Sequence, residues 1–201
     1  MLAWPQQAED TGQAGPLEFR SPGIEALVRR MQEPRRYHIL DLGPALAANV
    51  RFFSRFRCRL YIEDVLRAWE HGGGLSPAPP RFVSPLPTGS GAQRLDLILA
   101  WDLFSYLERD AVTALMSALV PACARGTWLF MVASTLPAIP ARPAACRILD
   151  EQRLRLDADF TSTRPNPGLT PKSLERMMPR FQLLHAFLSR SGLQEYLFSF
   201  E

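Results

Sequence analysis

The chain has 201 residues, of which 47% are hydrophobic, enough to fold one domain around a full core, so the composition excludes a disordered chain. Its formal net charge is only +3, and no dense run of basic residues is interleaved with aromatic ones, which argues against a nucleic-acid-binding protein. Of the 23 basic residues only Lys172 is a lysine, a bias typical of GC-rich, bacterial coding sequences.

Cysteine and histidine are scattered along the chain. Cys58, Cys123 and Cys146 form no CxxC pair, and their odd number argues against a disulfide framework. The three histidines have no metal-ligand spacing, so we expect no metal. The N-terminus lacks the pattern of a signal peptide, and no apolar stretch reaches the roughly 18 residues of a membrane span. We therefore expect a cytoplasmic protein with no membrane segment.

The N-terminal region is polar and rich in Gln, Gly and Pro, which predicts a mobile arm over residues 1–20 and a single domain over residues 21–201. Ser21 followed by Pro22 indicates a helix start, with an N-cap and then proline at the first helical position. The apolar face of this helix consists of Ile24, Leu27, Val28 and Met31.

Residues 37–64 have the length and pattern of a strand–helix–strand unit. An apolar run at 37–43 predicts a buried strand, and 58–64 predicts a second strand that ends in two acids. The helix between them, over 45–56, has its apolar residues at helical spacing: Leu46, Val50, Phe53 and Phe56. Such a crossover makes the two strands parallel.

Strands and helices continue to alternate from residue 64 to residue 135. After a short helix at 64–74, a loop rich in Pro, Gly and Ser contains one brief candidate strand at 81–86. A buried strand at 94–102, a helix at 108–123 and a strand at 126–135 follow. This rhythm predicts an α/β fold with a mostly parallel, doubly wound sheet covered on both faces.

The composition and the hydrophobic pattern of the sequence change after residue 135. Residues 136–168 have many prolines and no steady period, and we expect an irregular excursion over the strand ends, with at most a short helix or strand near 148–156, that acts as a lid or substrate loop. Thr170 and Pro171 begin a capped helix. The tail predicts two strands joined at Ser191-Gly192, where a hairpin favours glycine.

Three motifs, "ILDLGPA" (39–45), "LDLILAWDLFSYL" (95–107) and "AFLSRSGLQEYLFSF" (186–200), give the sequence a family resemblance. Together with the order of elements, they resemble the class I S-adenosylmethionine-dependent methyltransferases from about Ile24 to the C-terminus. The resemblance implies a seven-stranded, doubly wound, mostly parallel sheet with a C-terminal antiparallel hairpin, and S-adenosylmethionine as cofactor without a metal. The first motif is degenerate, because only Gly43 matches the family's two or three glycines, and the usual acid or amide beside the adenine has no counterpart.

The resemblance implies a cofactor site at the ends of three strands. Its nine residues are Asp41, Leu42, Gly43, Pro44, Glu63, Asp64, Ala100, Trp101 and Asp102. Asp41 would accept a hydrogen bond from its own loop or, through water, from the ligand's ammonium group. Glu63, more than Asp64, would accept from both ribose hydroxyls, whereas Asp64 also fits an acid at a helix N-terminus. Trp101 would contact the cationic sulfur or an aromatic acceptor.

Gly43 has a physical reason in this site. Doubly wound sheets bind ligands at the carboxyl ends of their strands, and a residue without Cβ allows a positive φ and close approach of a ligand. A cofactor without phosphate needs fewer glycines than a dinucleotide, so the sequence argues more strongly against an NAD-dependent oxidoreductase than against S-adenosylmethionine. For a catalytic base the candidates are Asp102, Tyr106 and His185, and nothing selects among them.

The sequence therefore predicts a methyltransferase that acts on a small-molecule or unidentified acceptor. The alternative is a catalytically inactive, methyltransferase-like interaction or regulatory module. The sparse glycines and the missing adenine-side acid favour the alternative, and the acid that ends the second strand favours the enzyme. The N-terminal arm and the terminal hairpin are both candidate contacts of a homodimer.

Overall fold

The computed structural model describes residues 16–71, 86, 94–189 and 191–201. Its α-helices are α1 (Pro22–Arg30), α2 (Ala47–Phe53), α3 (Val65–His71), α4 (Arg109–Leu119) and α5 (Pro171–Met177), and its 3-10 turns are η2 (Leu103–Ser105) and η3 (Val120–Ala122). Its strands are β1 (Leu17–Arg20), β2 (Tyr37–Asp41), β3 (Cys58–Ile62), β4 (Leu95–Trp101), β5 (Cys123–Ser134), β6 (Ala138–Pro140), β7 (Ala145–Ile148), β8 (Arg153–Asp157), β9 (Thr163–Pro165), β10 (Phe181–Leu188) and β11 (Leu193–Phe200).

A central sheet organises the molecule. In the described part of the chain it has six strands in the order β10-β11-β5-β4-β2-β3. Strands β3, β2, β4 and β5 are parallel, whereas β11 pairs antiparallel with both β5 and β10. The fold is therefore α/β. The resemblance implies seven strands in this sheet, whereas the described residues form six. The predicted brief strand at 81–86 lies outside the described residues except for Leu86.

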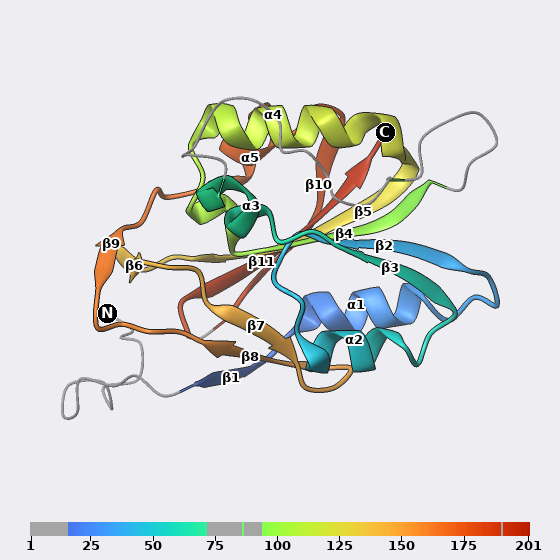
Figure 1. The fold of residues 1–201 in the computed structure, drawn as a ribbon, viewed down its shortest axis with the longest axis horizontal. Helices are drawn as coiled ribbons and strands as arrows, with labels where there is room; N and C mark the ends of the chain where they lie inside the picture. The colour runs from blue at the N-terminus through green and yellow to red at the C-terminus, as the bar shows by residue number, and fades with distance from the viewer. Residues whose placement is uncertain (1–15, 72–85, 87–93, 190) are drawn as a thin grey trace.

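The sheet separates two hydrophobic cores. Helices α3, α4 and α5 lie on one face, and α1, α2 and the small sheet of β1, β7 and β8 lie on the other (Figure 1). On the first face Leu115 of α4 and Leu174 of α5 are completely buried. On the second face Ile24 of α1 and Phe53 of α2 pack in the same cluster as Phe130 of β5. Both faces of the parallel strands are thus covered, which explains their continuous apolar runs.

Local signals in the sequence begin two helices as predicted. The Ser21 hydroxyl accepts a hydrogen bond from Ile24 N at 3.0 Å, directly before Pro22. Thr170 forms a capping box with Ser173, because each side chain accepts from the other residue's backbone N–H, at 3.2 and 2.9 Å. These caps satisfy N–H groups that a helix leaves without a partner.

The predicted apolar face of α2 is wrong at one position. Val50 is 42% exposed, whereas Asn49 beside it is buried. The Asn49 amide donates to Cys146 O at 3.0 Å and accepts from Ile148 N at 2.9 Å. Because these bonds satisfy strand β7, the helix turns a polar residue inward, which hydrophobic spacing alone does not show.

The predicted N-terminal arm ends earlier than residue 20. Leu17–Arg20 form strand β1, which pairs antiparallel with β8, so that Phe19 lies opposite Leu154. Phe19 is buried in the core beside α1. The arm prediction is therefore wrong for residues 17–20, and residues 1–15 lie outside the described part.

Residues 136–168 contain more regular structure than predicted. Strands β7 and β8 form an antiparallel hairpin that joins β1 in a three-stranded sheet, and β6 pairs with β9. The buried residues of the hairpin alternate with more exposed ones, in the order Cys146, Ile148, Leu154 and Leu156. This period of two was present in the sequence, but each run was too short to stand out among the prolines.

Candidate functional site

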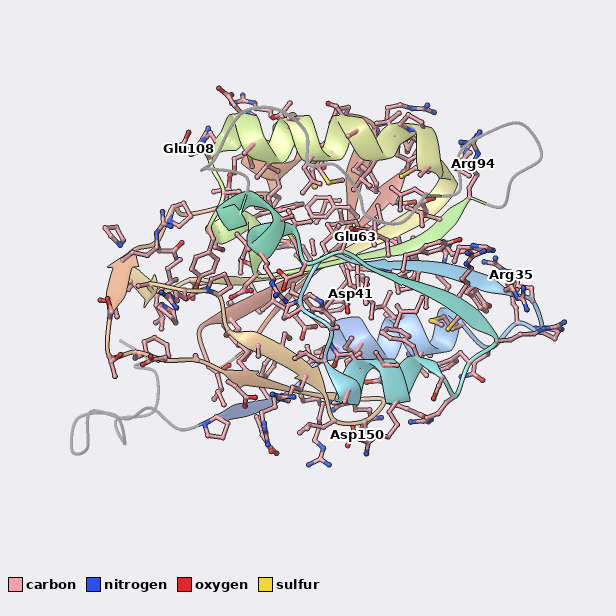
Figure 2. All side chains as sticks on the ribbon, in the orientation of Figure 1. Arg35, Asp41, Glu63, Arg94, Glu108 and Asp150 are labelled. Atoms are coloured by element: carbon pink, nitrogen blue, oxygen red, sulfur yellow. The ribbon has the colours of Figure 1, made fainter. Side chains whose placement is uncertain are left out.

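The candidate site lies where the parallel strands β2, β3 and β4 end. Strand β2 runs between β3 and β4, so the loops that follow the three strands meet at one edge of the sheet. Backbone bonds tie these loops together: Leu42 N donates to Leu99 O at 2.9 Å, and Glu63 N donates to Asp41 O at 2.8 Å. Figure 2 shows Asp41 and Glu63 near the middle of the molecule, between the two layers of helices.

A cavity of about 370 Å³ lies at this edge, and we call it the first cavity. Seven of the nine residues that the resemblance selected line it: Leu42, Gly43, Pro44, Asp64, Ala100, Trp101 and Asp102. The segment after β5 contributes Pro143, Ala144 and Cys146. Sequence reasoning missed these three residues, although the expected excursion over the strand ends was the right region. The alternation that defines β7 was the signal that could have located them.

Asp41 lies behind the wall of the first cavity and is 1% exposed. Its Oδ1 accepts hydrogen bonds from Gly43 N at 3.0 Å and from Trp101 Nε1 at 2.6 Å. The predicted bond from its own loop is thus confirmed. Burial raises the pKa of Asp41 to about 6, and the bonds from Trp101 and Gly43 oppose that rise. The carboxyl group is therefore largely committed to holding this corner of the protein together.

Trp101 explains why residue 43 is glycine. A Cβ on Gly43 would lie 2.8 Å from Cδ1 of Trp101, so only glycine leaves room for the indole ring. Gly43 does not have the expected positive φ; Trp101 has one instead, at 49°, an uncommon conformation for a bulky residue. The indole also packs edge-to-face on Phe130 at 5.9 Å between ring centroids. We expected a glycine here because a ligand would approach the backbone closely. In the structure it is the Trp101 side chain that lies close to Gly43.

The two acids after β3 have different surroundings. Asp64 lines the first cavity, and its Oδ1 accepts from Arg67 N at 3.2 Å, as a cap on α3. Glu63 is 5% exposed and does not belong to the described cavity lining. Asp64 therefore combines the helix-start role with access to the cavity, whereas the sequence had favoured Glu63 for the ligand.

Asp102 connects the first cavity with a second one. The second cavity, of about 450 Å³, shares Asp102 and Ala144 with the first. Asp102 Oδ2 accepts from Ala144 N at 3.1 Å, and burial raises the pKa of Asp102 to about 6. A carboxylate with that pKa can take up a proton near neutral pH.

The other two candidate bases are less suited to the chemistry. Tyr106 lines the second cavity, where burial and the negative charge of Asp102 raise its pKa well above the ordinary value, so it holds its proton. His185 is exposed on β10 and does not belong to the described lining of either cavity. Asp102 is therefore the candidate that the geometry favours.

No group of three or more His, Cys, Asp or Glu among the described residues is placed to hold a metal ion. In the same part of the chain, every helix is too short or too polar to cross a lipid bilayer.

Comparison with solved structures finds similar folds at low sequence identity. The 1,6-didemethyltoxoflavin-N1-methyltransferase of Burkholderia thailandensis, with 1,6-didemethyltoxoflavin and S-adenosylhomocysteine bound, is 14% identical with a TM-score of 0.47, over 88% of this chain and 76% of that one. The PH0226 protein of Pyrococcus horikoshii OT3 is 8% identical with a TM-score of 0.49, over 89% and 88% of the two chains. An S-adenosylmethionine-dependent methyltransferase of Clostridium acetobutylicum ATCC 824 is 12% identical with a TM-score of 0.48, over 88% of each chain.

No protein-family model matches the sequence, and no curated protein matches it. Likenesses with TM-scores below 0.5 do not identify an activity. The functional argument therefore rests on the two cavities and on the residues that line them.

Proposed function

We propose that the protein is an S-adenosylmethionine-dependent methyltransferase that acts on a small-molecule acceptor. One observation carries the proposal: seven of the nine residues chosen from sequence motifs line a single cavity at the carboxyl ends of parallel strands. Ligands of doubly wound sheets bind at that edge.

The charges at the first cavity suit a cation. Among its described lining residues, Asp64 and Asp102 are acidic and none is basic, and Asp41 lies directly behind the wall. These carboxyl groups would repel the pyrophosphate of a dinucleotide, whereas they favour a ligand with a sulfonium and an ammonium group. The residues present therefore fit S-adenosylmethionine better than NAD.

Each of these residues has a separate part in the proposal. Asp64 would hold the ribose hydroxyls, since a carboxylate can accept two hydrogen bonds at once. S-adenosylmethionine, when bound, supplies a methyl group on a positively charged sulfur. Asp102, at the boundary of the two cavities, would accept the proton that a hydroxyl or amine acceptor releases. The walls position the two reactants, and positioning alone can contribute several kcal/mol, up to about 7–11, to lowering the barrier.

Isothermal titration calorimetry tests this proposal directly. We expect S-adenosylmethionine and S-adenosylhomocysteine to bind one molecule per chain and NAD to show no binding. Asp64→Asn should weaken both affinities at least tenfold, because asparagine still caps α3 but brings no charge. Glu63→Gln is the matched control and should leave them unchanged. If Glu63→Gln weakened binding and Asp64→Asn did not, Glu63 would be the residue that holds the ribose. If the wild type bound neither S-adenosylmethionine nor S-adenosylhomocysteine, the proposal would be overturned.

A further inference from the structure

The second cavity is a distinct compartment beside the first. It is enclosed by the end of β5, by β6 and β8, and by the start of β11, with Val132, Ile139, Leu156 and Leu193 among its walls. Strands β6 and β8 belong to the segment after β5. The sequence predicted this segment as a substrate loop, and its position against the second cavity gives that role a physical basis.

The chemistry of the walls is mostly apolar. Ten of the fourteen described lining residues have apolar side chains, as is typical of small-molecule sites. Among these residues Asp102 is the one acid, and none is basic. An anionic ligand body would lose its hydration here without gaining an ion partner, whereas an apolar body would gain from leaving water.

Asp102 lies where the two cavities meet, so it contacts whatever atom of a second ligand comes closest to the first. The guanidinium carbon of Arg164 lies 5.8 Å from the centroid of the Tyr106 ring, which lines the second cavity. A carboxylate at the boundary repels an anion. It can accept the O–H of an alcohol or phenol.

We propose that the second cavity binds an uncharged, largely apolar alcohol or phenol with its hydroxyl against Asp102. This proposal rests on the proposed function and names the acceptor class for it. In the reaction the acceptor oxygen bonds to the methyl carbon as the bond from that carbon to sulfur breaks. The hydroxyl proton passes to the Asp102 carboxylate, so the products are a methyl ether, a neutral thioether and a protonated Asp102 that returns its proton to solvent.

The test uses three naphthalene compounds with different charges. Calorimetry or NMR titration at pH 8, where Asp102 is ionised, should show 2-naphthol binding without any cofactor. The anion 2-naphthoate should bind at least tenfold more weakly, because the Asp102 carboxylate repels it, and the cation 2-naphthylmethylammonium represents the competing assignment to a charged acceptor. Tighter binding of either ion than of the alcohol would overturn the assignment to an uncharged acceptor.

Two variants locate the binding site and one variant tests the charge. Ala158 lines the second cavity, so Ala158→Trp should fill it and weaken 2-naphthol binding at least tenfold. The control Ala186→Trp, on an exposed position of β10, should leave binding unchanged. Asp102→Asn removes the repulsion and should make 2-naphthoate bind at least tenfold more tightly. Unchanged 2-naphthol binding to Ala158→Trp would overturn the site.

Titration of the same variants with S-adenosylmethionine separates the two proposals. Ala158→Trp should bind it like the wild type, because Ala158 lines only the second cavity. Binding of 2-naphthol without binding of S-adenosylmethionine would contradict the proposed cofactor and keep the apolar site. Binding of S-adenosylmethionine without that of 2-naphthol would contradict the acceptor class alone.

Discussion

Asp41 is the last residue of β2 and Asp102 follows the neighbouring parallel strand β4, and burial raises the pKa of each carboxyl group to about 6. Their neighbourhoods differ. Asp41 is 1% exposed and accepts from both Gly43 and Trp101 through one oxygen. Asp102 is partly exposed and lines both cavities. A perturbed pKa therefore marks a structural acid in one case and a candidate proton acceptor in the other, and only the surrounding contacts distinguish them.

The Trp101 side chain determines what Asp41 and Gly43 of the first motif do in this protein. The Trp101 indole packs against Gly43 and donates a hydrogen bond to Asp41. The acid and the glycine of the first motif therefore hold the indole ring in place. Gly43 and Trp101 still line the first cavity, together with Pro44 and Asp64, whereas Asp41 does not belong to its described lining. The degenerate motif is thus consistent with a wall built by an indole instead of by a glycine-rich loop.

Trp101→Ala should have the largest effect on the free energy of unfolding, because it removes the side chain that contacts both Asp41 and Gly43. Loss of a buried indole costs about 3–5 kcal/mol of unfolding free energy in a packed core. Urea unfolding of the wild type and the variant at pH 7 measures this loss of unfolding free energy. Trp101→Phe keeps an aromatic ring but no N–H donor, and should cost less, about 1–3 kcal/mol for the hydrogen bond. If both variants were as stable as the wild type, the indole would not hold Asp41 in place.

The stability difference between wild type and Asp41→Asn should depend on pH. Burial raises the pKa of Asp41 from 3.8 to about 6, so folding favours its protonated form. This contribution is fully present below the unfolded pKa, near 4, and is lost as pH rises through 6. A rise of about 2 in pKa corresponds to about 3 kcal/mol.

Urea unfolding of both proteins between pH 4 and pH 8 measures this effect. The asparagine oxygen can still accept from Gly43 and Trp101, so the variant keeps the bonds and lacks only the charge. Relative to the variant, the wild type should lose up to about 3 kcal/mol over that range. A difference that stays constant with pH would show that Asp41 keeps its ordinary pKa in the folded protein.

Gly43→Ala should destabilise the protein through Trp101 and not through a ligand. The added Cβ would meet Cδ1 of Trp101 at 2.8 Å, and overpacking of this kind costs about 1–3 kcal/mol. A double-mutant cycle decides the cause: in the Trp101→Ala background most of the penalty should vanish, because only Asp41 Oδ1, at 3.3 Å, remains close to the methyl group. An equal penalty in both backgrounds would mean that the backbone at residue 43 requires glycine by itself.

The strand ends that bear the site could be read from the sequence. Each long apolar run became a parallel strand, and helix caps such as Ser21 stood directly before proline, so local rules located most of the fold. The same rules brought Gly43, Asp64 and Asp102 to one cavity, because parallel strands end at a common edge.

The contacts that assign roles were out of reach of those rules. The choice between Glu63 and Asp64 depends on which side chain faces the cavity, and adjacent residues look alike in a motif. The contact of Trp101 with Gly43 joins residues that are 58 positions apart. Strands β6, β7, β8 and β9 are only three to five residues long, so their alternation does not stand out in the sequence, and β8 pairs with β1 across more than 130 positions.

Thr170→Ala should have the smallest effect and serves as a reference for the others. The capping box at the start of α5 joins Thr170 and Ser173, neither of which belongs to the described lining of the two cavities. Loss of the cap should cost about 1 kcal/mol of unfolding free energy and leave S-adenosylmethionine and 2-naphthol binding unchanged. Because this loss of stability lies away from Asp41 and Asp102, weakened binding in this variant would show that general destabilisation, and not the two carboxyl groups, governs the affinities.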